Sequence, residues 1–342
     1  MIWKNAELYN VSELKYSEEK GGWSMLRVPE SVADNMSERG RVLNLAGCGC
    51  EIRFRLNSGS AKIKLSAGDG DGPTAIRPVV YYGSIGSGWE HCFKNVFSEP
   101  TEIEIPAHDN MDALRKIHSE HKLPFAPELV RVILQNRPLF IYDISGDIEP
   151  PKSEDAPKRR YLAYGSSITH GSLALLQVNT WTNRIAENTG SDLINLGFAG
   201  AAHLEPCIAD YIASRNDFDF ATLEMGINIL DIDPEDFRGR VRRFVSTIAK
   251  AHPDKMFFCI DVFYCSSDLF GDGKAALFRK IVRDELADMA FANTVHIDGL
   301  KMLTSSKGLS GDLVHPNVRG VEEIAANLTA EIKKVLYNNP TE

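Results

Sequence analysis

The chain has 342 residues, 43% of them hydrophobic, so it is long enough for two domains with sizeable cores. Its 38 basic and 47 acidic residues give a formal net charge of -9, which disfavours nucleic acid or an anionic membrane as the main partner. The sequence begins without a signal-peptide core and has no apolar run long enough to cross a bilayer, so we expect a soluble, cytoplasmic protein.

The cysteines are few for this length and are spread along the chain: Cys48, Cys50, Cys92, Cys207, Cys259 and Cys265. This distribution is typical of reduced thiols in a cytoplasm. Cys48 and Cys50 form a C-x-C pair, but without a second Cys or His pair nearby it is weak evidence for zinc. We therefore expect free cysteines and no metal.

In the predicted first domain, residues 1–148, the apolar residues from Trp23 to about Asp147 recur mainly with the period of two that is typical of strands with one wet face. Strands are predicted at 23–28, 51–56, 61–65, 78–82, 91–96, 101–105, 129–134 and 139–144. Turn-rich gaps such as 57–60 and 68–73 separate them, so consecutive strands can fold back on one another. A helix at 111–122 interrupts the series. The pattern predicts an antiparallel β-sandwich or jelly-roll domain.

The segment 149–160 is polar and rich in proline, which predicts a linker. In residues 161–342, short apolar runs alternate with helix-like segments. Strands are predicted at 161–164, 193–198, 220–225, 256–263 and 295–297, and helices at 181–188, 205–214, 235–251, 274–291 and 318–337. This order predicts an α/β domain with a five-stranded parallel sheet and helices on both faces. Sites in such sheets form beyond the carboxyl ends of the strands.

A serine follows the first predicted strand of this second domain. The run Gly165-Ser166-Ser167-Ile168-Thr169 breaks the apolar pattern abruptly, and its glycine permits a tight turn. Such a turn can hold a hydroxyl where a substrate carbonyl approaches it, although similar turns also occur for backbone reasons alone. The function of Ser167 therefore depends on partners elsewhere in the chain.

Three later segments offer such partners. Gly197-Phe198-Ala199-Gly200 can point backbone N–H groups into a crevice, and Asn228 can donate its side-chain amide to developing negative charge. Asp312 and His315 can hydrogen-bond each other, so that the carboxylate fixes the tautomer in which the imidazole accepts a serine proton. Taken alone, each segment also has a purely structural interpretation. Gly197–Gly200 could be an ordinary loop, Asn228 could cap a loop, and His315-Pro316 could mark the start of a helix. Together they favour one crevice.

These blocks resemble, in the same order, those of the SGNH or GDSL-type hydrolase superfamily over about residues 161–337. The blocks are Gly165-Ser166-Ser167-Ile168-Thr169, Gly197-Phe198-Ala199-Gly200, Gly226-Ile227-Asn228 and Asp312-Leu313-Val314-His315. The resemblance implies a flavodoxin-like catalytic domain with Ser167 as nucleophile, His315 as general base and Asp312 as its orienting acid. It also implies an oxyanion hole made by the Ser167 and Gly200 N–H groups and the Asn228 side chain, and it requires no cofactor.

Two positions depart from the superfamily pattern. Ser166 stands where an Asp usually precedes the nucleophile, and Ile229 stands where an Asp often follows the Asn of the third block. Neither departure removes a group that the chemistry needs, but both separate this chain from typical lipase-like members. The Gly-x-Ser-x-Gly elbow of α/β-hydrolases is absent, because Thr169 occupies its last position.

The sandwich resembles, at the level of the fold, the jelly-roll modules of some carbohydrate-active SGNH esterases and related acyltransferases. Its aromatic residues could stack on sugar rings, but aromatics in alternating strands more often pack a core; they are Trp23, Tyr81, Tyr82 and Trp89. The domain could equally shape the rim of the crevice at Ser167.

We expect an esterase that removes a small acyl group, acetyl, from a carbohydrate or similarly polar ester through an acyl-enzyme. An acyltransferase would use the same site to pass the acyl group to an alcohol, and a noncatalytic carbohydrate-binding protein on a decayed hydrolase scaffold is a third hypothesis. His170 and His203 are candidate substrate contacts, which could also simply face solvent. The oligomeric state cannot be derived from the sequence.

Overall fold

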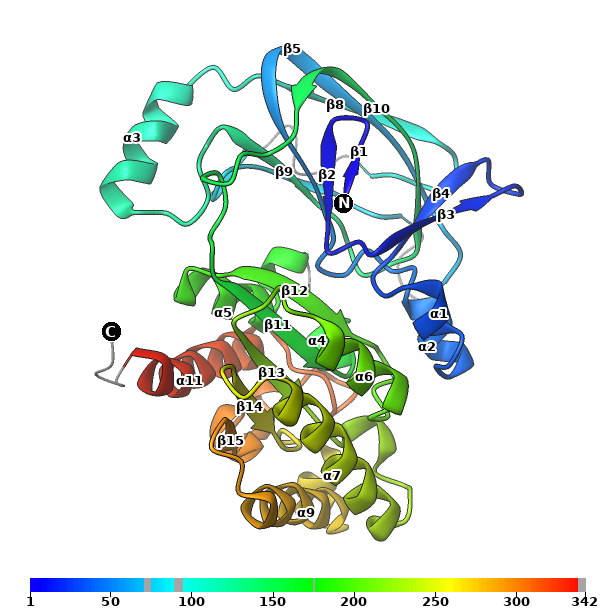
Figure 1. Cartoon of the computed structure of the whole chain (residues 1–342), viewed down its shortest axis with the longest axis vertical. Helices are drawn as coiled ribbons and strands as arrows, with labels where there is room; N and C mark the ends of the chain where they lie inside the picture. The colour runs from blue at the N-terminus through cyan, green and yellow to red at the C-terminus, as the bar shows by residue number, and fades with distance from the viewer. Residues whose placement is uncertain (71–74, 89–94, 175, 338–342) are drawn as a thin grey trace.

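The structure, a computed structural model of the chain, describes residues 1–70, 75–88, 95–174 and 176–337. Within these ranges the chain forms an antiparallel sheet, uppermost in Figure 1, and a parallel sheet below it. The predicted architecture is confirmed: an antiparallel β domain precedes a five-stranded parallel sheet. No helix of the described ranges is both long enough and apolar enough to span a lipid bilayer.

The antiparallel sheet is built around one long strand, β5 (Glu51–Ala67). β10 (Leu139–Glu149) pairs along one side of β5, and β9 (Leu129–Ile133) and β8 (Thr101–Pro106) pair in succession along the other. The predicted helix after β8 is present as α3 (Met111–His121). The remaining strands are β1 (Ile2–Trp3), β2 (Ala6–Tyr9), β3 (Glu13–Ser17), β4 (Gly22–Leu26), β6 (Val79–Tyr82) and β7 (Ile85–Gly86).

Residues 57–60, predicted as a turn between two strands, lie inside β5 and do not reverse the chain. Asn57, Ser58 and Gly59 are exposed, and Gly59 has a left-handed φ of 67°. They mark the point where β5 passes from pairing with β9, up to Arg55, to pairing with β8, from Ser60. A strand that bends where it changes pairing partner, and whose two faces are both in contact with water, needs the same polar residues and glycine as a turn. Local composition therefore could not distinguish a bent strand from a turn.

Parts of the N-terminal region carry structure that the sequence patterns did not predict. β1, β2 and β3 precede residue 18, and two short helices, α1 (Glu30–Ala33) and α2 (Glu38–Leu43), follow β4. Such short elements contain too few periods for an apolar repeat to be visible. The two helices lie below the antiparallel sheet, beside the parallel-sheet domain (Figure 1). Predictions at Trp89, Cys92 and most of the strand 91–96 fall outside the described residues.

The parallel sheet has the strand order β12-β11-β13-β14-β15, so the strand order reverses at β11. The crevice at the carboxyl end of β11 is therefore the expected place for a site. The strands agree closely with the predicted ones: β11 (Arg160–Gly165), β12 (Asp192–Gly197), β13 (Phe220–Glu224), β14 (Met256–Ile260) and β15 (Thr294–Ile297).

Helices cover both faces of this sheet, as predicted. Leu162 of β11 belongs to a core with α6 (Pro206–Ser214), α7 (Pro234–Ala251) and α9 (Lys274–Met289). Its neighbour Tyr161 belongs to a second core with α5 (Trp181–Thr189) and α11 (Val318–Tyr337). Successive strand residues thus face opposite layers. The short helices are α4 (Ser167–His170), α8 (Ser266–Phe270) and α10 (Gly299–Met302).

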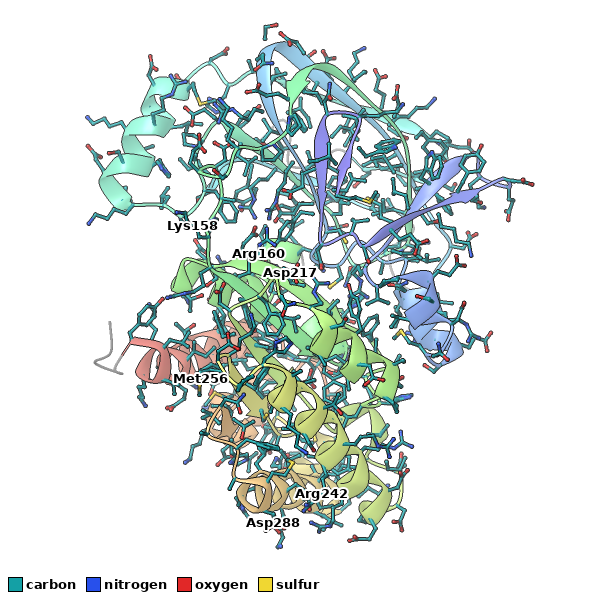
Figure 2. All side chains as sticks on the ribbon, in the orientation of Figure 1. Lys158, Arg160, Asp217, Arg242, Met256 and Asp288 are labelled. Carbon is teal, nitrogen blue, oxygen red and sulfur yellow. The ribbon has the colours of Figure 1, made fainter. Side chains whose placement is uncertain are left out.

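The connection between the two sheets spans residues 150–159, one residue shorter at each end than the predicted linker. Asp155 within it is buried, and its carboxylate accepts hydrogen bonds from Arg55 at 2.5 Å and from the Lys152 N–H at 2.7 Å. Where the chain enters β11, Arg160 pairs with Asp217 at 3.6 Å (Figure 2). The division into domains 1–148 and 161–342 stays a prediction.

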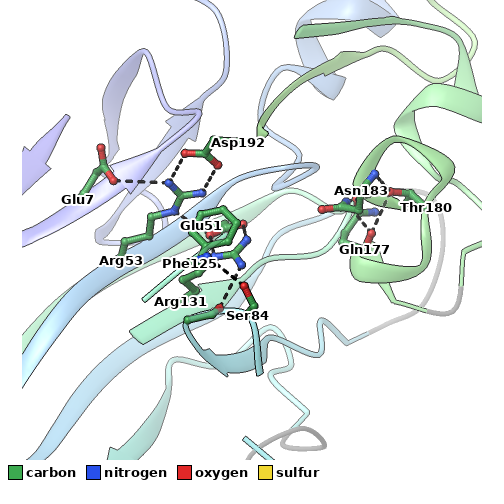
Figure 3. A network of polar contacts seen from close by, with 11 residues as sticks. Glu7, Glu51, Arg53, Ser84, Phe125, Arg131, Gln177, Thr180, Asn183 and Asp192 are labelled. Atoms are coloured by element: carbon green, nitrogen blue, oxygen red, sulfur yellow. Dashed lines mark hydrogen bonds and ion pairs between the residues drawn. The ribbon is translucent and has the colours of Figure 1, made fainter. Parts of the chain in front are cut away.

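A buried network of charges joins the two sheets (Figure 3). Arg53 of β5 donates to both carboxylate oxygens of Asp192, the first residue of β12, at 2.7 Å each, and to Glu51 at 2.7 Å. Arg131 of β9 donates to the same Glu51 carboxylate at 2.5 and 2.8 Å. Burial alone would raise the pKa of Glu51, but the Arg131 and Arg53 guanidiniums outweigh it and lower that pKa to about 2.

We expect acid to weaken this network in the wild type and to have no such effect on the network in Glu51→Gln. The folded-state pKa of Glu51 lies below its unfolded value, so its stabilisation is complete above about pH 4.5 and is lost as the pH falls towards 2. The full effect is about 3 kcal/mol in the free energy of unfolding. In urea unfolding at pH 7 and pH 3, the wild type should lose more stability than Glu51→Gln. Glu102→Gln, which changes an exposed carboxylate, should resemble the wild type, and equal losses in wild type and Glu51→Gln would contradict this account.

Candidate active site

Ser167 begins the short helix α4, with one residue between it and the end of strand β11, at which the strand order of the parallel sheet reverses. Ser166 is the N-cap of that helix, and its hydroxyl accepts a hydrogen bond from the helix backbone at 3.1 Å. A Cβ atom at Gly165 would lie 2.2 Å from Thr169 Oγ1 and 2.4 Å from Glu224 Oε2, so the turn requires glycine there. The turn places Ser167 at the carboxyl edge of the sheet.

The loop before α11 brings the two predicted partners to Ser167. His315 Nε2 lies 2.7 Å from Ser167 Oγ, and His315 Nδ1 lies 2.6 Å from Asp312 Oδ2. Asp312 Oδ1 accepts the backbone N–H groups of Val314 and His315 at 3.0 Å each. Burial would raise the pKa of Asp312, but these N–H groups and the imidazole lower it below its usual value. The ionised carboxylate favours a proton on Nδ1, which leaves Nε2 to accept the hydroxyl proton.

Gly200 and Asn228 border the same pocket as Ser167 and His315, in the loops after β12 and β13. Gly200 has a φ of 70°, a conformation that residues with a side chain rarely adopt. The side-chain oxygen of Asn228 accepts the Ala202 N–H at 3.2 Å, so the planar amide directs its NH2 group away from that contact. The structure brings the proposed oxyanion donors together, and their role stays a prediction.

The pocket beside Ser167 has a volume of about 420 Å³, and residues from both the N-terminal region and the parallel-sheet region line it. Arg39 and Leu43 come from α2, and Asn136 comes from the segment after β9. The other lining residues belong to the parallel-sheet domain: Ser167, His170, Ser172, Ala199, Gly200, Ile227, Asn228, Val314 and His315. The N-terminal region that contains the antiparallel sheet therefore contributes to the rim of the crevice through α2 and the segment after β9, which is one of the two roles that the sequence left open for it.

A second, much smaller recess borders the same Ser167 and His315 side chains. Its volume of about 10 Å³ matches a single group of the size of a water molecule or a methyl group. The wall is mostly apolar and is formed by Ile168, Gly171, Ser172, Leu173, Ala174, Thr180, Trp181, Pro316 and Val321.

The two candidate substrate contacts differ in position. His170 is only 1% exposed, with Nδ1 2.9 Å from the Gly197 oxygen and Nε2 3.4 Å from the Asn136 oxygen. Burial, aided by Arg27, lowers the pKa of its imidazole to about 4. The alternative that His170 faces solvent is wrong, because its side chain is buried. His170 lines the pocket of about 420 Å³, and its contact with a substrate stays a prediction. The described lining of that pocket does not include His203, so the structure does not bring His203 to the site.

Glu224, the last residue of β13, is a site residue that the sequence patterns did not single out. Its buried carboxylate accepts hydrogen bonds from Ser166 N at 2.8 Å, Ser166 Oγ at 2.7 Å and Thr169 Oγ1 at 2.8 Å. Burial raises its pKa above the usual value, although these donors oppose the shift. An Asp at position 166 would place a second carboxylate against Glu224, which accounts for the departure at Ser166. The sequence signal that could have identified Glu224 is that it is the one charged residue in β13.

Within the described residues, no group of three or more His, Cys, Asp or Glu side chains could hold a metal ion. Cys48 and Cys50 are buried free thiols, and burial raises the pKa of each to about 12. Cys207, Cys259 and Cys265 are also free.

Among solved structures, the chain is similar to a salicylyl-acyltransferase from a tetracycline biosynthetic pathway, at 20% identity and a TM-score of 0.76, covering 97% of this chain and 96% of that one. It is also similar to a family two carbohydrate esterase from Cellvibrio japonicus, at 11% identity and a TM-score of 0.63, covering 96% and 95%. A family two enzyme with a carbohydrate binding domain from Corynascus thermopiles shows 17% identity and a TM-score of 0.61, covering 84% and 94%. At these identities the similarity shows the shared fold.

Comparison with curated proteins finds no match. The model of the GDSL-like lipase/acylhydrolase family, in contrast, matches residues 158–333. This range is slightly more than half of the chain and contains β11 to β15 and the segments that carry Ser167, Gly200, Asn228, Asp312 and His315. The protein therefore belongs to the GDSL-like lipase/acylhydrolase family.

Proposed function

We propose that this protein is a serine esterase that hydrolyses a small acyl ester, an acetyl ester, on a carbohydrate or similarly polar molecule. The proposal is carried by the continuous chain of contacts from Asp312 through His315 to Ser167, at 2.6 and 2.7 Å. Such a chain activates a serine hydroxyl for attack on a carbonyl carbon. Membership of an acylhydrolase family supports the same class of reaction.

In the first half of the reaction, Ser167 Oγ attacks the ester carbonyl carbon while His315 Nε2 takes the hydroxyl proton. Asp312 keeps the Nδ1 proton in place and stabilises the imidazolium. The N–H groups of Ser167 and Gly200 and the amide of Asn228 hold the oxyanion, and loss of one such donor typically costs about 3 kcal/mol of transition-state stabilisation. As the intermediate collapses, His315 gives its proton to the departing alcohol oxygen.

The second half releases the acid from the acyl-enzyme. A water molecule attacks the acyl carbon while His315 Nε2 takes one of its protons, and the same three donors hold the new oxyanion. When the bond between the acyl carbon and Ser167 Oγ breaks, His315 returns the proton to Ser167. An alcohol in place of water would give the transfer reaction instead.

The two hollows beside Ser167 support the choice of substrate. The recess of about 10 Å³ suits the methyl group of an acetyl ester. The pocket of about 420 Å³ is large enough for a sugar-sized alcohol portion, and its wall includes the polar side chains of Arg39, Asn136 and Asn228. The shared fold with family two carbohydrate esterases is consistent with a carbohydrate substrate.

The recess predicts a strong preference for the shortest acyl chain. For aryl esters, we expect kcat/KM to fall about 10- to 100-fold from acetate to hexanoate, because additional methylene groups must displace the recess wall. Leu173→Ala should narrow that ratio, since it shortens an exposed side chain of the wall. Leu269→Ala, at an exposed leucine outside this wall, is the matched control and should keep the wild-type ratio. A wild type that prefers hexanoate would contradict the small-acyl assignment.

Product analysis separates the hypotheses on the acceptor. The protein is incubated with a panel of acetylated sugars, with and without an added alcohol, and the products are identified by mass spectrometry. Free acetate and deacetylated sugar support the esterase, and acetylated alcohol in place of acetate supports an acyltransferase. Binding of the sugars without turnover of any ester would support the noncatalytic protein and refute the proposal.

A further inference from the structure

We propose that Arg27, a residue of the antiparallel-sheet domain, positions the oxyanion loop of the active site. The oxyanion loop is defined as residues 197–202, which begin at the last residue of β12 and include Gly200. This inference rests on the esterase function proposed above. It adds a requirement that catalysis depends on a side chain far from the family-matched residues 158–333 in the sequence.

The Arg27 side chain is fully buried, with an exposed fraction of 0%. Its Nη1 donates to the carbonyl oxygens of Asn195 at 3.1 Å and Gly197 at 2.9 Å, near the end of β12. Its Nη2 donates to the Leu43 oxygen at the end of α2 at 2.7 Å, and its guanidinium lies over the Phe198 ring, 4.6 Å from the centroid. Arg27 thus contacts the first two residues of the oxyanion loop and ties them to α2.

Two further contacts join the same loop to its surroundings. His170, the last residue of α4, lies with Nδ1 2.9 Å from the Gly197 oxygen that also accepts from Arg27. Arg39 of α2 donates from Nε to the Ala199 oxygen at 3.1 Å. The Gly197 oxygen therefore receives one donor from the antiparallel-sheet domain and one from the helix that carries Ser167. The position of the loop relative to Ser167 depends on both.

A second buried arginine, Arg53, joins the two sheets at a different point from Arg27. Arg53 pairs with Asp192 at the start of β12, the end opposite the oxyanion loop, through two contacts of 2.7 Å between opposite charges. Arg27 meets only carbonyl oxygens among its described hydrogen-bond partners, so no carboxylate offsets the cost of burying its charge. Burial accordingly lowers the pKa of Arg27.

A buried cation without a carboxylate partner contributes little to holding the two sheets together. It does stabilise negative charge that develops nearby. The tetrahedral intermediate places such a charge at the oxyanion loop. Arg27 therefore has two effects on the same step: it fixes the backbone that carries the Gly200 N–H, and it adds positive potential. Both effects act on the transition state more than on the bound ester, so they belong to kcat rather than to KM.

The test compares Arg27→Met with Arg53→Met, two variants that each remove a fully buried arginine between the sheets. Hydrolysis of an aryl acetate is measured for the full chain, and active sites are counted by titration with an aryl phosphonate. Both variants should be less stable to urea. Only Arg27→Met should lose about 10- to 100-fold in kcat per active site with KM nearly unchanged, and Arg27→Lys should recover part of that loss.

Equal kcat losses in the two methionine variants, or wild-type kcat in Arg27→Met, would overturn the inference. If Arg27→Met does not fold, Arg27→Lys provides the test, because it keeps the positive charge but replaces the forked guanidinium, which bonds the Asn195, Gly197 and Leu43 oxygens, by a single donor atom. It should still lower kcat per active site, whereas Arg41→Gln, which removes an arginine of α2 whose Nη1 is bonded to the Met36 oxygen, should not. Absence of turnover in the wild type would refute the esterase proposal and not this contact specifically.

Discussion

Ser167→Ala is expected to lower kcat/KM for an aryl acetate by about 10⁴-fold or more, the largest effect of any single substitution in the chain. The variant lacks the only oxygen within 2.7 Å of His315 Nε2 among the described residues, so no acyl-enzyme can form. The measurement is steady-state hydrolysis, with an aryl phosphonate as a covalent probe. The wild type should gain the mass of one phosphonyl group on Ser167, and Ser167→Ala should gain none.

Ser166→Ala is the matched control for this assignment. It removes the neighbouring hydroxyl, which contacts Glu224, but leaves Ser167 Oγ in place. Because it perturbs the turn and not the attacking atom, we expect a loss of about tenfold, far smaller than that of Ser167→Ala. Comparable turnover by Ser167→Ala and the wild type would refute Ser167 as the nucleophile.

Asp312→Asn is expected to lower kcat about 10³- to 10⁴-fold with little change in KM. The two N–H groups of Val314 and His315 both bind Oδ1, so the Asn oxygen must stay at that position to accept them. The Asn NH2 group then faces His315 Nδ1, 2.6 Å away in the wild type, and donates to it. This contact places the imidazole proton on Nε2. A protonated Nε2 cannot accept the proton of Ser167.

The pH dependence distinguishes this tautomer effect from simple loss of a charge. The Asp312 carboxylate has a pKa below its usual value, so it stays ionised through the mildly acidic range, and the wild type should retain its oriented imidazole there. Asp312→Asn should be impaired at every pH at which the protein is folded. Asp143→Asn, which changes an exposed aspartate of β10, is the control and should match the wild type. Wild-type kcat in Asp312→Asn would contradict the proposed role.

Much of the fold and of the site was predictable from local patterns. The strands and long helices of the parallel sheet repeat their apolar periods several times, so their positions agree with the structure within a few residues. Ser167, Asp312 and His315 were identifiable because each lies in a short block with special backbone needs, and the blocks follow one another in a recognisable order. The tight contacts around Gly165 are an example of such a need.

Other features had no local signal. β5 is one strand rather than two, because the bend at Gly59 is set by β8 and β9, which pair with it from later in the chain. α2 is too short to show a periodic pattern, yet it delivers Arg39 to the pocket at Ser167. These outcomes depend on contacts between residues separated by many positions, which composition and periodicity do not encode.

Local sequence thus accounts for the α/β architecture, the strand that ends at Gly165 and the candidate set of Ser167, Asp312 and His315, because apolar periodicity and turn chemistry act within a few residues. The docking of the two sheets settles which side chains complete the crevice. Arg27 reaches the Gly197 oxygen across 170 positions of sequence, and such a contact exists only once both domains have packed around a shared, water-excluded interface.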